Sequence, residues 1–130
     1  MQARATLTLA ALLGFLGVAL GAFGAHGLKS VLEPAMMTVY QTGVQYHQIH
    51  AVALLVIGLW QLLRPTSPEH GSLKWAALFM LGGVLLFSGS LYTMAMSSVR
   101  MLGMITPIGG VSWLIGWALL ARAGWQSADS

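Results

Sequence analysis

Four long apolar runs, almost free of charge, constrain this chain more than any other feature. They extend over about residues 6–25, 46–63, 73–94 and 104–121. Each approaches the roughly 20 mostly apolar residues that an α-helix needs to cross a bilayer. Hydrophobic residues make up 57% of the chain and charged residues 7%, a composition too apolar for a soluble domain. The sequence therefore predicts an all-α integral membrane protein, with a single four-helix transmembrane bundle over residues 1–130.

The stretch between the first two spans has a mixed composition. Residues 28–45 alternate apolar side chains with Lys29, Glu33 and Gln41, and Pro34 suits the first turn of a helix, where its missing N–H costs nothing. We expect an amphipathic segment that lies in the membrane interface and leads into the second span.

The basic residues predict the orientation of the bundle. Four of them flank one side of the predicted spans: Arg4, Arg64, Lys74 and Arg122. The other side has two, Lys29 and Arg100. Because Lys and Arg are enriched in cytoplasmic loops, both termini are predicted to be cytoplasmic, including a short tail at residues 126–130. The six basic residues form no patch, so we expect no nucleic-acid partner. The lipid bilayer is the expected partner, together with a second copy of the chain or another membrane protein.

Polar side chains gather near the predicted outer ends of the spans. They are His26, Tyr46, His50, Ser88, Ser90 and Thr106. Polar groups inside a membrane are costly unless they are paired, so their collection at one depth favours a shared pocket or a hydrogen-bonded seam. We expect these six side chains to meet in the outer half of the bundle.

The histidines leave several kinds of site open. His47 and His50 are three residues apart and could bind one metal ion from a single helix face, with His26 as a third ligand. A structural role, with hydrogen bonds to hydroxyl groups or backbone carbonyls, is the simpler interpretation. No cysteine or nearby carboxylate strengthens the metal interpretation, so no cofactor is predicted.

Catalysis lacks a complete set of residues. Ser88 or Ser90 could act with His50 as nucleophile and base, but the spans contain no Asp or Glu that would orient the imidazole. Glu33 is the one acid on the same side, and it would have to fold back onto the helix ends. The sequence predicts no catalytic residues and no enzyme activity.

Two residue types indicate how the spans pack. Glycines such as Gly17 and Gly21 recur at helical spacing, which favours close approach of helix backbones. The five tryptophans lie mostly near span ends, where indole rings anchor a helix at the interface. They are Trp60, Trp75, Trp113, Trp117 and Trp125.

Four motifs, in this order along the chain, resemble a known family. They are Gly21-Ala22-Phe23-Gly24-Ala25-His26-Gly27-Leu28; Thr42-Gly43-Val44-Gln45-Tyr46 followed by His50-Ala51; Phe87-Ser88-Gly89-Ser90-Leu91-Tyr92; and Ile105-Thr106-Pro107-Ile108-Gly109-Gly110. The resemblance is to the small bacterial inner-membrane proteins called domain of unknown function 423. It implies a four-helix protein of the bacterial inner (plasma) membrane and supplies no activity. His47 is not part of the pattern.

Two functional hypotheses follow. The first is a non-enzymatic membrane protein that packs against itself or a partner and holds a small molecule or lipid in a polar pocket of the outer leaflet. The alternative is a metal- or haem-binding or transport component that uses His26 and His50.

Overall fold

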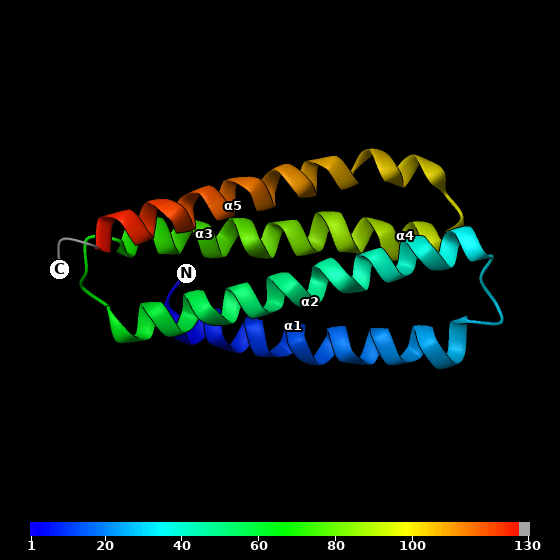
Figure 1. Ribbon diagram of the computed structural model, residues 1–130, viewed down its shortest axis with the longest axis horizontal. Coiled ribbons are helices and arrows are strands. Elements are labelled where there is room, and N and C mark those ends of the chain that lie inside the picture. The colour runs from blue at the N-terminus through cyan, green and yellow to red at the C-terminus, as the bar shows by residue number, and fades with distance from the viewer. Residues whose placement is uncertain (128–130) are drawn as a thin grey trace.

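Long helices lie side by side with roughly parallel axes in the computed structural model, which describes residues 1–127 (Figure 1). In chain order the elements are α1 (Ala3–Phe23), the π-helical segment η1 (Gly24–Leu28), α2 (Pro34–Leu63), α3 (His70–Gly83), the π-helical segment η2 (Val84–Ser88), α4 (Gly89–Ser97), the 3₁₀ segment η3 (Arg100–Met104) and α5 (Thr106–Ser127). The described residues contain no strand. The predicted all-α membrane fold is confirmed.

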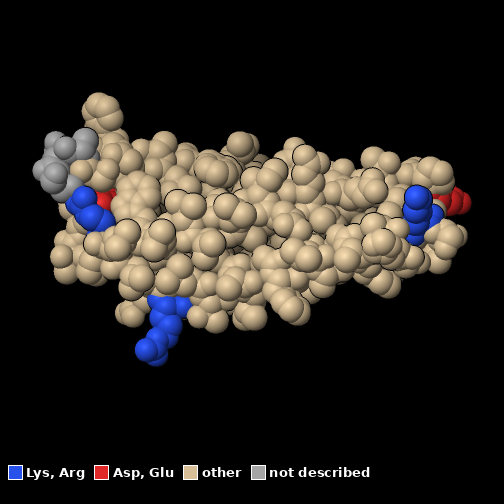
Figure 2. Space-filling model, turned by 60° about the horizontal axis from the view of Figure 1, so that its bottom comes forward, with Lys and Arg blue, Asp and Glu red and all other residues tan. Residues whose placement is uncertain are grey.

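The elements join into four continuous apolar helices, each long enough to cross a membrane. They are Ala3–Leu28, Pro34–Leu63, His70–Ser97 and Arg100–Ser127, with lengths of 26, 30, 28 and 28 residues. The N-terminus and the last turn of α5 lie at one end of the bundle, here called the terminus end, and the α1–α2 turn lies at the opposite far end (Figure 1). Lys and Arg side chains lie toward the two ends, and the middle of the face seen in Figure 2 carries no charge.

The helices α2 and α3–α4 form the middle of the bundle. α1 packs chiefly on α2, α5 packs chiefly on α3 and η2, and α2 also packs on α3 and α4. In the most apolar stretch of each span, 17% of the residues are buried for α1 and for α5, against 44% for α2 and 39% for α3–α4. The outer helices therefore expose most of their apolar surface to the surroundings, which suits contact with lipid.

The second span begins well before Tyr46. Pro34 stands in the first turn of α2 after the extended residue Glu33, and the helix continues without a break to Leu63. The amphipathic segment expected from the sequence is thus the first part of α2. Tyr40 within it is buried and donates a hydrogen bond from its hydroxyl to the carbonyl of Leu20 at 2.5 Å, so this segment packs on α1.

The longer helix changes the depth of the predicted site. Tyr46 is the thirteenth of the 30 residues of α2, counting from Pro34, and His50 is the seventeenth. At 1.5 Å per residue, Tyr46 lies about 18 Å from the start of a helix about 45 Å long. The polar residues of α2 therefore lie near its middle and not at the far end. The sequence predicted a later start for this span because polar side chains such as Gln41 and Gln45 interrupt the apolar pattern of its first turns.

Two glycines let α5 approach its neighbours closely. A Cβ atom on Gly83 of α3 would lie 2.1 Å from the Trp113 ring, and one on Gly109 of α5 would lie 2.3 Å from the backbone nitrogen of Phe87. Gly17, which the sequence singled out, faces the flexible side chain of Gln48 at 3.2 Å. Close packing at small residues is thus present, and it is tightest where α5 meets α3 and η2.

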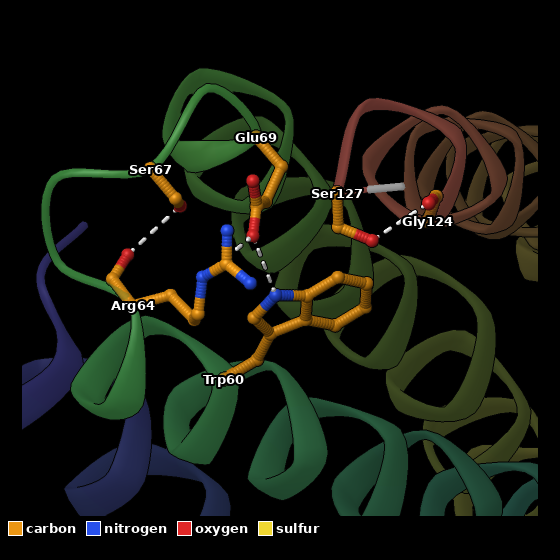
Figure 3. Close-up of polar contacts among 6 residues, drawn as sticks. All are labelled: Trp60, Arg64, Ser67, Glu69, Gly124 and Ser127. Atoms are coloured by element: carbon orange, nitrogen blue, oxygen red, sulfur yellow. Dashed lines mark hydrogen bonds and ion pairs between the residues drawn. The ribbon is translucent and has the colours of Figure 1, made fainter. Parts of the chain in front are cut away.

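A buried carboxylate closes the loop between α2 and α3 at the terminus end (Figure 3). Glu69 Oε1 accepts a hydrogen bond from Trp60 Nε1 at 3.1 Å and lies 3.4 Å from Arg64 Nε. Burial by itself raises the pKa of Glu69, but hydrogen bonds from its own backbone N–H, from Trp60 and from Ser67, with the Arg64 charge, outweigh burial and lower this pKa. The ionised side chain fastens the loop to the last turn of α2.

The shared end of the N-terminus and the last turn of α5 leads to a topological prediction. A reporter enzyme that is active only in the periplasm should stay inactive when it is fused after Ser130, and the same reporter fused after Val31, beyond the first span, should be active. The basis is the excess of basic residues at the terminus end. The reverse pattern of activity would show that the bundle is inserted the other way.

Adjacent glycines of α5 provide a matched test of the packing. Gly109→Ala should lower the melting temperature in detergent, because its Cβ meets the backbone of Phe87 and overpacking of this kind costs about 1–3 kcal/mol. Gly110→Ala should leave the melting temperature unchanged, because its nearest neighbour, Phe87 Cδ2, lies at 3.9 Å. Equal melting temperatures for the two variants would contradict the close approach of α5 to η2.

Candidate functional site

His47 connects α2 to two other helices through its ring nitrogens. Its side chain is 1% exposed. Nε2 lies 2.8 Å from the carbonyl oxygen of Leu13 in α1, and Nδ1 lies 2.8 Å from the hydroxyl of Tyr92 in α4. A carbonyl can only accept a hydrogen bond, so Nε2 carries the proton and the Tyr92 hydroxyl donates to Nδ1 of the neutral ring. One imidazole thus joins α1, α2 and α4.

His50 connects α2 to α5 with the opposite tautomer. Its Nδ1 lies 2.7 Å from the carbonyl oxygen of Tyr46, and its Nε2 accepts a hydrogen bond from Trp117 Nε1 at 3.1 Å. Because an indole N–H can only donate, Nε2 carries no proton and Nδ1 does. The ring also stacks on Trp113 with centroids 3.7 Å apart and planes at 5°. Both nitrogens are engaged, and the ring is fixed in place.

A groove opens between α2 and α5 beside His50. We call it the aromatic groove; its volume is about 570 Å³, and its lining is Tyr46, Ile49, His50, Phe87, Pro107, Gly110, Val111, Trp113, Leu114 and Trp117. A second groove of about 470 Å³, here called the aliphatic groove, shares Ile49 and Trp117 with it. Its lining is Ile49, Val52, Ala53, Val56, Trp117 and Leu120. The two grooves follow one another along the same pair of helices.

The rings of the aromatic groove pack against one another. Tyr46 lies 5.1 Å from Phe87 and 5.9 Å from Trp113 between ring centroids, and Phe87 lies 4.7 Å from Trp113. These separations are typical of favourable aromatic pairs, which prefer offset or tilted rings. α2 and α5 are therefore held apart by side-chain rings in this region, while α5 touches η2 directly.

The six side chains predicted to share one pocket are divided among several places. Tyr46 and His50 lie together in the aromatic groove. Ser88 donates to the carbonyl of Gly43 at 2.8 Å, which joins η2 to α2. A 2.6 Å hydrogen bond joins Ser90 to Thr106, across the start of α5.

His26 is separate from all of them. It is exposed in η1 at the far end, and within residues 1–127 no hydrogen bond or ring contact joins it to another candidate. The single pocket expected from the sequence is therefore not formed. His26 also lies at another depth, because His47 is level with Leu13 of α1 and His26 lies 13 residues, or about 20 Å, further along toward the far end.

The geometry bears on the metal and catalytic hypotheses as well. No group of three or more His, Cys, Asp or Glu side chains that could hold a metal ion occurs among the described residues. Coordination by His47 or His50 would have to break one of the hydrogen bonds given above. Ser88 and Ser90 both bond elsewhere than to His50, so the nucleophile and base considered from the sequence are not paired.

The sequence interpretation missed the role of two tryptophans. Trp113 is 4% exposed, donates from Nε1 to the carbonyl of Met80 at 3.0 Å and lies well inside α5, and Trp117 contacts His50. Both had been interpreted as interface anchors. Their spacing of four residues, which puts both indoles on one helix face, is the signal that could have identified the groove. Trp125, 84% exposed near the terminus end, suits the anchoring role.

Comparison with known proteins places the chain among small membrane proteins. Residues 20–110 match the family model described as "protein of unknown function (DUF423)". The UPF0382 membrane protein YwdK of Bacillus subtilis is 41% identical over 117 residues, which cover 90% of this chain and 93% of YwdK. The UPF0382 inner membrane protein YgdD of Escherichia coli K12 is 42% identical over 120 residues, which cover 92% and 88% of the two chains. No solved structure matches the chain.

The two buried hydrogen bonds of His47 lead to a stability prediction. His47→Ala should destabilise the bundle, because a buried partner that loses its hydrogen bond costs about 1–3 kcal/mol and a cavity is left as well. His26→Ala is the matched control, since His26 is exposed, and it should leave the protein unchanged. The melting temperatures of the two variants in one detergent provide the measurement. An unaffected His47→Ala protein would show that this ring does not hold the helices together.

Proposed function

The chain belongs to the DUF423 family of membrane proteins, and from that premise we propose that it is a non-enzymatic protein that holds one lipid-like molecule in the groove between α2 and α5. The observation that carries the proposal is the aromatic groove itself. Its volume of about 570 Å³ falls within the roughly 300–1,000 Å³ of small-molecule sites, which are mostly apolar and carry few polar groups.

The surroundings of the groove support a ligand that enters from the bilayer. Residues of its rim are strongly exposed on the outside of the bundle: Val111 at 53% and Leu114 at 69%. In a membrane these side chains face hydrocarbon. A hydrophobic molecule can therefore move sideways from the bilayer into the groove and needs no aqueous path.

The hydrogen bonds in the groove support a role in ligand binding and not in catalysis. The His50 nitrogens are both engaged, and Trp113 and Trp117 each donate their indole N–H to the protein. A general base needs a free lone pair within reach of the substrate proton. His50 would first have to give up its bond to Trp117.

The bilayer is the partner proposed for the outer helices, both termini being on its cytoplasmic side. The exposed surface of α1 includes Leu12, Phe15 and Val18, at 58%, 75% and 63% exposure. Lipid tails cover such a surface without any specific contact. A second copy of the chain or another membrane protein could occupy part of the same surface, and the mass of the intact complex distinguishes these cases.

Filling the groove tests the proposal. Gly110 lines it, and its Cβ position has free space up to 3.9 Å, so Gly110→Leu should fill the groove without moving the backbone. We expect native mass spectrometry of the gently extracted protein to show a bound small molecule that Gly110→Leu reduces at least tenfold. Gly14→Leu is the control, because a Cβ at Gly14 meets nothing within 4 Å and Gly14 lies on α1. Equal retention by both variants, or no bound molecule in either, would refute the proposal.

A further inference from the structure

The two grooves have different chemistry, and this difference identifies the class of molecule that fits them. Resting on the proposed function above, we infer that the occupant is an uncharged ring compound with a hydrogen-bond-accepting oxygen and a long hydrocarbon tail, the class to which isoprenoid quinones belong. The ring would lie in the aromatic groove and the tail in the aliphatic groove.

The shape of the site requires an elongated molecule. Ile49 and Trp117 belong to both grooves, so the two are continuous. On α2 their lining extends from Tyr46 to Val56, ten residues or about 15 Å of helix. A compact ligand would fill only one of the two grooves, whereas a ring followed by a chain can fill both.

The wall of the aromatic groove favours a flat ring. The exposed aromatic surface comes chiefly from Tyr46 and Trp117, which are 41% and 44% exposed, with Phe87 beside Tyr46. His50 and Trp113, stacked on each other and each 4% exposed, contribute little open surface. Planar rings gain from offset or tilted contact with such surfaces beyond their burial alone. The aliphatic groove offers no ring besides Trp117, and its other side chains, such as Val52 and Leu120, suit a hydrocarbon chain.

One hydrogen-bond donor is available in the aromatic groove. His50 and the two indoles of the lining are engaged with protein partners. The hydroxyl of Tyr46, by contrast, has no hydrogen bond to any residue in the described part of the chain, and its side chain is 41% exposed. Inside a membrane this unpaired phenolic hydroxyl gains from a ligand that brings an acceptor, such as a quinone carbonyl.

The depth of the aromatic groove argues against a charged headgroup. Tyr46 lies 12 residues after Pro34 and 17 before Leu63, or about 18 and 26 Å from the two ends of α2. The lining of both grooves contains no Lys, Arg, Asp or Glu. A phosphate at this depth would be desolvated without a counter-charge, which is costly. A phospholipid could place an acyl chain here but not its headgroup.

Decylubiquinone is the probe for the test, with the full-length protein in phosphatidylcholine nanodiscs. Binding is measured by quenching of tryptophan fluorescence, since Trp113 and Trp117 line the groove. Wild-type protein should show a saturable component above the linear quenching caused by probe dissolved in the lipid. Gly110→Leu should lose this component and Gly14→Leu should keep it. An excess of 1-decanol, which has the chain without the ring, should compete poorly.

Tyr46→Phe tests the hydrogen bond separately. It removes one hydroxyl and keeps the ring, so we expect the saturable component to remain with an affinity about three- to tenfold weaker, as one lost hydrogen bond implies. Unchanged affinity, or effective competition by 1-decanol, would overturn the assignment of the ring class.

The result separates the two proposals. If quenching is linear and equal in wild-type and Gly110→Leu proteins, the inference about ring compounds is overturned. Should Gly110→Leu nevertheless lose a copurified acyl lipid in native mass spectrometry, the groove still binds a lipid-like molecule and the proposed function stands. If Gly110→Leu reduces neither the binding of the probe nor the amount of copurified molecule, both the inference about ring compounds and the proposed function are overturned.

Discussion

The arrangement of the bundle depends on the buried imidazole of His47. It accepts a hydrogen bond from Tyr92 of α4 and donates one to the Leu13 carbonyl of α1, so two helices are held to α2 at one level. In a membrane the apolar surfaces of helices gain little from contact with each other, because lipid tails are equally apolar. Directed hydrogen bonds and close packing must therefore fix the relative rotation of the helices, and at this level His47 fixes α2 against α1 and α4.

His50, one turn further along α2, holds α5 to α2 in the same way. The two rings adopt opposite neutral tautomers because each donates to a backbone carbonyl, through Nε2 in His47 and through Nδ1 in His50. The remaining nitrogen of each ring then accepts, from Tyr92 and from Trp117. A charged form of His50 would point an N–H at the indole N–H of Trp117, so the observed contacts require the neutral ring. A spacing that suggested metal binding thus serves to connect four helices.

The sequence predicted the four helices because apolar length is a direct consequence of bilayer thickness. It did not predict which residues meet, since helices that are apolar on most faces carry little information about rotation. The predicted site rested on a common depth for His26 and His50, but α2 begins earlier than expected, so His50 lies near the middle of the bundle and His26 at its far end. Tyr46 and His50 lie together because their contact is local to one helix. The anchoring role predicted for Trp113 rested on the frequent place of tryptophans near span ends, and its burial follows from the absence of a side chain at Gly83.

The groove arises from an imbalance in how α5 contacts its two neighbours. Gly83 and Gly109 remove side chains where α5 meets α3 and η2, so the backbones there come close together. Toward α2, the contact is made by Trp113 and Trp117 against His50. Large rings on one side and glycines on the other shift α5 away from α2 and leave a space open to the bilayer. Because the same rings that keep the helices apart also line this space, its shape and its aromatic chemistry have one structural cause.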